Sequence, residues 1–170
     1  MKTISTISFL SFILLTAGSF ASNHKSSTGF EKIKSLAGTW EGTVDHGTGP
    51  MQMTVVYEIT AGGSAVQETI FPGTEEEMVT LYYNKGGKLG LTHYCMLQNR
   101  PEMILKSSSK KKLIMEFDPS CEIDPKTESH MNSVTFIFEG KNKMIQDWAF
   151  FENGEKQDHG KPFELTRVDP

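Results

Sequence analysis

The residue of this chain with the greatest capacity for chemistry is a histidine in the middle of an apolar segment. His93 lies in the run Leu89-Gly90-Leu91-Thr92-His93-Tyr94-Cys95. Because side chains alternate along a strand, His93 shares one face with the two leucines and with Cys95. An imidazole on such a face can anchor a ligand, act as a general base or coordinate a metal. The alternative is a core histidine held by a neighbouring hydroxyl or carboxylate.

A carboxylate stands in a similar position in an earlier segment. Glu68 lies between Val66 and Ile70 on one strand face, and Gln67 is on the opposite face. A carboxylate among apolar side chains must be paired or have a raised pKa, whereas a glutamate on a polar stripe stays exposed. If Glu68 and His93 both point inward, they could act as acid and base on a bound molecule. The sequence leaves their separation open.

Metal and covalent chemistry have less support. His93 and Cys95 could both contact a metal, but zinc takes about four ligands, and the third candidate, His130, opens a predicted strand. The sequence has no Gly-x-Ser-x-Gly elbow, phosphate loop, His-Glu-x-x-His or Cys-x-x-Cys motif. We therefore predict no metal ligands and no catalytic residues, and enzymatic activity stays an alternative.

The first residues have the pattern of an export signal. Lys2 precedes a mostly apolar run over 7–20, and Ser19-Phe20-Ala21 places small residues where signal peptidase reads. The run is shorter than the roughly 20 apolar residues that a membrane span needs, although an uncleaved anchor is the alternative. We expect a signal peptide over 1–21, a disordered polar linker over 22–28 and one domain over 29–170. The mature chain would be periplasmic or secreted, without a transmembrane segment.

Composition narrows the class of partner. The formal net charge is −4, from 17 basic and 21 acidic residues, which argues against nucleic acid. The basic run Lys110-Lys111-Lys112 follows three serines and reads as a solvated hairpin tip. Export would permit a disulfide between Cys95 and Cys121, and the alternative is two small buried apolar side chains.

The elements that must position these residues are short strands. A brief amphipathic helix is predicted over 29–36, ending at Gly38. Beyond it, apolar and polar residues alternate between turn-forming segments such as 61–63, 84–87 and 153–154. About ten strands with local turns are typical of an all-β fold. Pairing in chain order favours a single closed antiparallel up-and-down barrel over a sandwich, because closure removes exposed edges.

Two residues near the ends of the chain fit such a barrel. Gly38-Thr39-Trp40 opens the first strand, and Arg167 lies in the last one. The first and last strands of a closed barrel are neighbours, so a guanidinium can cover the indole ring. We predict that Trp40 and Arg167 form a structural plug, the alternative being a core tryptophan and a surface arginine.

Several further segments carry a family pattern over most of Phe30 to Val168. These segments are Gly38–Trp40, Gly62–Gly73, Glu77–Tyr82, Leu91–Met96, Asn99–Pro101, Trp148 and Phe163–Arg167. Together they resemble a bacterial lipocalin-like family of the calycin superfamily whose function is unknown. The resemblance implies a calycin-type barrel of roughly ten strands and does not imply an activity.

Nitrobindin, a haem-binding barrel, is a more distant likeness. Its haem-ligating histidine lies near the C-terminus, where this chain offers His159 in a predicted loop. The glycine-rich segment that follows the first-strand tryptophan in nitrobindin is only partly echoed here. Haem ligation is therefore not carried over to this chain.

The apolar side chains indicate what the barrel could hold. The chain has 11 Phe, 4 Tyr, 2 Trp and 9 Met, and alternation turns about half of its strand residues inward. They would line a soft apolar cavity, or simply fill the interior. We predict non-catalytic binding of a small apolar or amphipathic molecule, without a cofactor. The predicted polar anchors are His93, Glu68, Gln67 and Tyr82. The alternatives are an enzyme that uses His93 and Glu68 as acid and base, and a barrel that binds haem or a metal.

Overall fold

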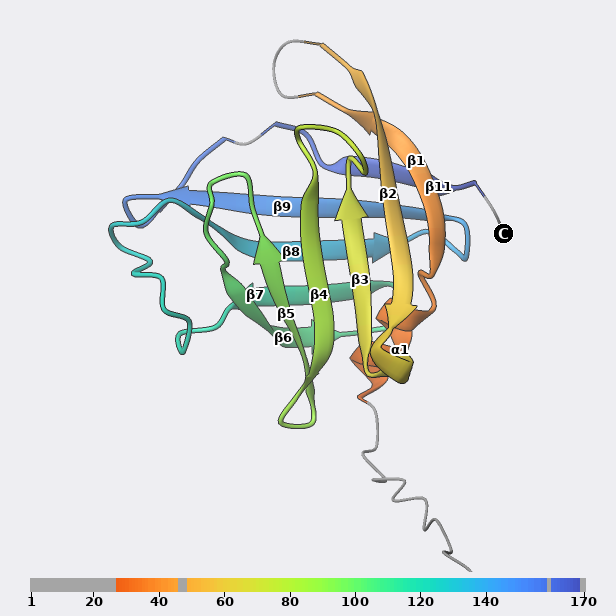
Figure 1. The fold of residues 1–170 in the computed structure, drawn as a ribbon, viewed down its shortest axis with the longest axis horizontal. Helices are drawn as coiled ribbons and strands as arrows, with labels where there is room; N and C mark the ends of the chain where they lie inside the picture. The colour runs from red at the N-terminus through yellow and green to blue at the C-terminus, as the bar shows by residue number, and fades with distance from the viewer. Residues whose placement is uncertain (1–26, 46–48, 159, 169–170) are drawn as a thin grey trace, which may run out of the picture.

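The chain folds into a closed antiparallel β-barrel. The computed structural model describes residues 27–45, 49–158 and 160–168, and Figure 1 shows strands β2 to β5 crossing over strands β7 to β9. The elements over these residues are α1 (Thr28–Lys34), β1 (Gly38–Val44), β2 (Met51–Thr60), η1 (Ala61–Gly63), β3 (Ala65–Ile70), β4 (Met78–Lys85), β5 (Lys88–Tyr94), β6 (Glu102–Ser108), β7 (Lys112–Phe117), β8 (His130–Phe138), β9 (Lys143–Glu152), β10 (Glu155–Lys156) and β11 (Phe163–Arg167).

The strands pair in chain order almost throughout. From β1 to β9, each strand is antiparallel to the next one along the chain. β9 also pairs with β11, and β11 pairs with β1, which closes a barrel of ten strands within the described residues. β10 is a two-residue hairpin extension of β9. The predicted barrel of about ten strands with a short helix is therefore confirmed.

The start of the domain differs slightly from the prediction. The predicted signal peptide and residues 22–26 of the predicted linker lie outside the described residues. α1 begins at Thr28, inside that linker, because the Ser27 side chain accepts a hydrogen bond from the Phe30 N–H at 3.2 Å and caps the helix. No helix in the described part of the chain has the length and apolar character that crossing a membrane requires.

β1 and β11 form the seam where the two ends of the barrel meet. Trp40 lies opposite Arg167 in this pairing, and Gly42 lies opposite Leu165. A Cβ atom on Gly42 would lie 2.1 Å from the carbonyl oxygen of Glu164, so only glycine fits without moving the backbone. The seam therefore depends on a close backbone approach at Gly42.

α1 and the two predicted plug residues close one end of the barrel. The Trp40 indole donates to the Leu36 carbonyl at 2.8 Å. The Arg167 guanidinium lies 4.4 Å from the centroid of the Trp40 ring and donates to the carbonyls of Ser35 and Ala37 at 2.8 and 2.5 Å. Carbonyls at the end of a helix have no partner within the helix. Arg167 therefore caps α1 and covers Trp40 at the same time, and we call this region the closed end.

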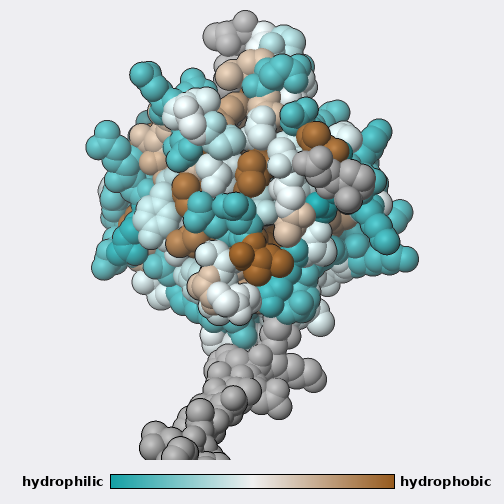
Figure 2. All heavy atoms as spheres, turned by 45° about the vertical axis from the view of Figure 1, so that its right-hand side comes forward, coloured by the Kyte–Doolittle hydropathy of each residue, from teal (hydrophilic) through white to brown (hydrophobic). Residues whose placement is uncertain are grey.

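The outer surface is mainly polar. Figure 2 shows hydrophilic side chains over most of one face, with the hydrophobic atoms in small separate patches. The lysine-rich tip between β6 and β7 is exposed, as the sequence predicts, and the Lys32 ammonium of α1 donates to the carbonyls of Ser109 and Lys110 in it. The two candidate residues with the greatest capacity for chemistry, His93 and Glu68, are both buried inside the barrel.

Candidate functional site

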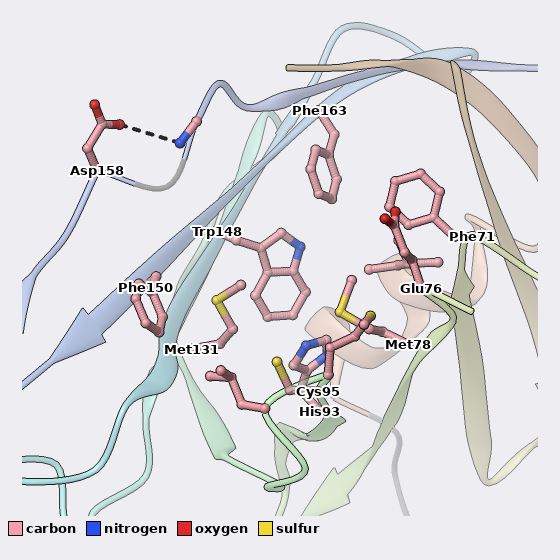
Figure 3. Close-up of a pocket in the computed structure, with 14 residues that line it drawn as sticks. Phe71, Glu76, Met78, His93, Cys95, Met131, Trp148, Phe150, Asp158 and Phe163 are labelled. Carbon is pink, nitrogen blue, oxygen red and sulfur yellow. Dashed lines mark hydrogen bonds between the residues drawn. The ribbon is translucent and has the colours of Figure 1, made fainter. Parts of the chain in front are cut away.

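A pocket of about 420 Å³ lies at the end of the barrel opposite α1, which we call the open end. It is built from the last residues of β3 and β5, the first residues of β4, β8 and β11, the second half of β9 and the segments that connect these strands. Figure 3 shows these side chains converging on the space beside Trp148. The described lining residues are Ile70, Phe71, Glu76, Met78, His93, Cys95, Met96, Leu97, Met131, Trp148, Phe150, Asp158, Gly160 and Phe163.

The pocket exists because β9 and β11 are paired over only part of the length of β9. β11 begins at Phe163, and its pairing with β9 runs from Lys143 to Gln146. Trp148 is the next inward residue of β9 and lies beyond this paired part. The pocket therefore opens where β9 continues and β11 has not yet begun.

His93 is the polar residue at the floor of this pocket. Its side chain is 1% exposed, and its Nδ1 lies 2.9 Å from the Thr80 hydroxyl oxygen. Its Nε2 is buried and has no hydrogen-bond partner among the described residues. Burial lowers the pKa of His93 to about 4, so the imidazole is neutral near neutral pH. The site thus contains a neutral ring with one unpaired nitrogen.

Trp148 provides a second unpaired nitrogen beside the first. The His93 and Trp148 ring centroids are 4.6 Å apart. The Trp148 side chain is 8% exposed, and its Nε1–H has no partner among the described residues. An unpaired buried donor or acceptor costs about 1–3 kcal/mol. A ligand with a polar group at this position would remove that cost.

Glu68 lies deeper in the barrel and is fully buried. Its Oε1 accepts hydrogen bonds from the Tyr57 hydroxyl at 2.5 Å and the Gln146 amide at 2.6 Å, and its Oε2 accepts one from the Tyr82 hydroxyl at 2.8 Å. Burial raises the pKa of Glu68, while these hydrogen bonds act in the opposite direction. Burial and the nearby carboxylate raise the pKa of both tyrosines, which therefore remain donors. Both oxygens of the Glu68 carboxylate therefore have hydrogen-bond partners within the core.

Thr80 connects this carboxylate to the pocket. It lies opposite Glu68 in the β3–β4 pairing and opposite His93 in the β4–β5 pairing. Its hydroxyl contacts His93 Nδ1 and also stabilises the Glu68 carboxylate. If the hydroxyl donates to Glu68, it accepts from His93 Nδ1–H, which leaves Nε2 as an acceptor facing the pocket. The structure thus brings Glu68 and His93 together through Thr80, without direct contact.

Of the four predicted anchors, His93 lines the pocket and the other three do not. Gln67 points to the outer face of β3, where its amide donates to the Thr69 hydroxyl at 3.3 Å. Gln67 therefore does not contact this pocket, because strand alternation turns it away from Glu68. Tyr82 and Glu68 are inside the barrel, but they bind each other below the pocket.

The cysteines and the remaining histidines offer no further ligand set. Among the described residues, Cys95 and Cys121 are free, so the disulfide that the sequence permits is not formed. The Cys95 side chain lines the pocket. Cys121 lies in the β7–β8 connection, where its thiol is 3.8 Å from the Arg100 carbonyl oxygen. His130 is buried and uses both ring nitrogens, with Glu128 and Asn132 as partners. The described residues contain no group of three His, Cys, Asp or Glu placed to hold a metal. His159 lies outside them.

Four residues that complete the site are not among the predicted polar anchors. Tyr57, Thr80, Gln146 and Trp148 each occupy an inward position of an alternating strand. Gln146 and Trp148 follow Met144 at a spacing of two, which is the signal that could have placed them inside the barrel. A polar side chain at an inward strand position is thus a better predictor of a site residue than the residue type alone.

Neither the protein-family models nor the curated protein sequences contain a match to this chain. The function is therefore inferred from the residues of the pocket. An apolar pocket with a neutral imidazole and an indole N–H at its floor can bind a small molecule through a few oriented hydrogen bonds.

Proposed function

We propose that this protein is an exported, lipocalin-like barrel that binds a small apolar or amphipathic molecule in the open-end pocket without transforming it. The observation that carries the proposal is the pair of buried, unpaired nitrogens, His93 Nε2 and Trp148 Nε1, in an otherwise mainly apolar pocket. Folded proteins leave few buried polar atoms unpaired, so two such atoms in one pocket call for an explanation, and a ligand provides one. The proposal gives both atoms a partner.

The dimensions and lining of the pocket support a small-molecule occupant. Its volume of about 420 Å³ falls within the range of about 300–1,000 Å³ that is usual for ligand sites. Met78, Met96 and Met131 contribute flexible, polarisable side chains that adapt to irregular apolar shapes. These features favour hydrophobic contact as the main source of affinity, with His93 and Trp148 setting the orientation.

Catalysis is the second candidate, favoured by the line from His93 through Thr80 to Glu68. The low pKa of His93 makes it a weak base near neutral pH. The fully buried carboxylate of Glu68 already accepts three hydrogen bonds and does not line the pocket. These two facts favour binding over acid–base chemistry. Conversion of a bound molecule by the wild type, abolished in His93→Ala, would favour the enzyme instead.

A haem or metal site is the third candidate. His93 Nε2 is the atom that would hold the iron or another metal, since it is unpaired and lines the pocket. The described lining contains no Lys or Arg to pair with the propionates of haem, and it supplies Glu76 and Asp158 instead. The residues present therefore fit haem poorly. Protein produced with haem supplied should show no Soret band, and a stoichiometric band would replace the binding proposal.

Export and family membership complete the proposal. The apolar run over 7–20 with Ser19-Phe20-Ala21 supports cleavage after residue 21. The segments that resemble the bacterial lipocalin-like family support a shared barrel fold. N-terminal sequencing of the exported protein tests the cleavage site directly, and a mature chain that still begins at Met1 would contradict it.

The binding proposal is tested with Nile red, a neutral dye whose emission depends on polarity. We expect saturable binding by the wild type, weakened by about tenfold or more in His93→Ala because one orienting contact is lost. Gln67→Ala is the matched control, since Gln67 lies on the outer face of the barrel. Native mass spectrometry of freshly purified protein should show an added small-molecule mass. Absence of binding by the wild type, or equal binding by His93→Ala and Gln67→Ala, would overturn the proposal.

A further inference from the structure

We infer that the ligand of the open-end pocket is an uncharged molecule that presents a hydroxyl group to His93 and Trp148. This inference rests on the proposed binding function and specifies the chemical class of the ligand. It comes from two independent properties of the pocket. One is the hydrogen-bonding capacity of the two unpaired nitrogens, and the other is the charge of the pocket lining.

The first property is the complementary capacity of the two nitrogens. The indole N–H of Trp148 can only donate, so the ligand must supply an acceptor. The Glu68 carboxylate opposite Thr80 favours the tautomer in which His93 donates Nδ1–H to the Thr80 hydroxyl, and in that tautomer Nε2 accepts and the ligand supplies a donor.

A hydroxyl group provides both functions on one atom. A carboxylate can accept but cannot donate, and an ammonium group can donate but cannot accept. The ring centroids of His93 and Trp148 are 4.6 Å apart, so the two rings border the same part of the pocket. One hydroxyl, or two hydroxyls on the same ligand, can therefore meet the needs of both nitrogens.

The second property is the charge of the lining. The described lining residues include two acids, Glu76 and Asp158, and no Lys or Arg. Figure 3 places Asp158 at the edge of the pocket, where its carboxylate accepts from the Gly160 N–H at 3.4 Å. Both acids are exposed, so their repulsion of an anionic ligand is screened, but the apolar floor would still bury the anion without a cation to pair with it, which is unfavourable. Charge therefore selects against carboxylates and phosphates.

The walls of the pocket suggest a suitable probe. Phe71, Phe150, Phe163 and Trp148 surround the space with aromatic rings. Aromatic rings pack favourably against a flat aromatic ligand in offset or edge-to-face arrangements. The naphthalene series therefore tests the inference, because its members share one skeleton and differ in a single substituent.

The experiment compares 2-naphthol, naphthalene, 2-naphthoate and 2-naphthylmethylamine in calorimetric titrations of the full barrel near neutral pH. We expect 2-naphthol to bind about tenfold tighter than naphthoate and the amine, and several-fold tighter than naphthalene. Naphthoate or the amine binding as tightly as naphthol would overturn the inference. If Nile red binds but naphthol has no advantage, the hydroxyl inference alone fails. If neither binds, the binding proposal fails with it.

Two variants separate the anchor from general packing. Trp148→Phe keeps an aromatic wall but removes the N–H, so it should weaken naphthol binding and leave naphthalene binding nearly unchanged. Glu76→Gln should improve naphthoate binding, whereas Glu75→Gln, a neighbouring exposed acid outside the pocket lining, should not. An equal loss for naphthol and naphthalene in Trp148→Phe would contradict the hydroxyl anchor. An equal response of Glu76→Gln and Glu75→Gln would contradict the role of lining charge.

Discussion

The two tryptophans of the chain lie at opposite ends of the barrel, and their indole N–H groups are in opposite states. At the closed end, Trp40 donates to the Leu36 carbonyl and lies under the Arg167 guanidinium. At the open end, Trp148 is almost as deeply buried, but its N–H has no partner among the described residues. The same residue type thus stabilises the fold at one end and is available to a ligand at the other.

The two buried histidines repeat this contrast. His130 lies between the Phe117 and Phe151 rings and uses both of its nitrogens. His93 uses one nitrogen and leaves the other unpaired in the pocket. Burial alone therefore does not separate structural from functional residues in this barrel. Buried side-chain oxygens of Asn84, Asn99 and Gln146 are also unpaired but do not line the pocket, so an unpaired atom marks a candidate ligand contact only where it faces that space. The closed and open ends should respond differently when single groups are removed.

The largest effect is expected at Glu68, which lies between the two ends. Glu68→Ala leaves two tyrosine hydroxyls and the Gln146 amide unpaired inside the barrel. The cost should be about 3–5 kcal/mol in the free energy of unfolding, measured by urea denaturation. Glu58→Ala, an exposed glutamate on β2, is the control and should change stability by less than about 0.5 kcal/mol. Similar losses in both variants would mean that the carboxylate does not hold the core together.

The open end should also make stability depend on pH through His93. Its pKa is about 4 in the folded state and 6.5 when unperturbed, so the unfolded chain binds the proton more readily. The stability from the neutral ring is fully present above pH 6.5 and is lost as pH falls towards 4, by about 3 kcal/mol in total. The wild type should lose that much more than His93→Gln over this range in denaturation experiments. Equal losses would assign the pH dependence to other groups.

At the closed end, removing Arg167 should reduce stability and leave binding intact. Arg167→Ala removes the cap of α1 and the cover of Trp40, at a cost of about 1–3 kcal/mol. Arg167→Lys should recover little, because an ammonium cannot form the same fork of hydrogen bonds. Arg100→Ala removes half-exposed ion pairs and should cost less than about 1 kcal/mol. Weakened Nile red binding in Arg167→Ala at unchanged stability would reverse the roles of the two ends.

The smallest effect comes from the direct comparison of the two indoles. Trp40→Phe and Trp148→Phe remove the same atoms, but only the first breaks a hydrogen bond within the described residues. Trp40→Phe should therefore be less stable by about 1 kcal/mol than Trp148→Phe, measured by thermal or urea unfolding. For binding of 2-naphthol the order is reversed: Trp148→Phe should bind it more weakly than Trp40→Phe. Equal stabilities would mean that the Trp148 N–H already has a partner in solution.

The barrel could be predicted because its signals are local. The helix predicted over 29–36 and the turns predicted at 61–63 and 84–87 depend on residues close together in the chain; the turns lie as predicted, and the helix, Thr28–Lys34, is displaced by one or two residues. Alternation also grouped Glu68 with Val66 and Ile70 on one strand face, and the structure shows that this face is the buried one. Gln67 is on the other face of the same strand, as alternation requires.

The site could be predicted only in part because its partners are distant in the chain. Glu68 bonds to Tyr57 and Gln146, which are 11 and 78 residues away, and the second contact exists only once the barrel has closed. The pocket depends on β11 beginning at Phe163 while β9 continues past Gln146. That mismatch of strand lengths has no signature in residue type, so the importance of Trp148 became evident only in the folded barrel.

The seam between β1 and β11 has a consequence for how the protein is made. Trp40 lies in the first strand and Arg167 in the last strand of the barrel, and the cap of α1 needs both. The closed end therefore cannot form until β11 has been synthesised and has paired with β1. A truncated chain that lacks Phe163 to Arg167 would expose unpaired edges on β1 and β9, and such edges promote aggregation by pairing with other chains.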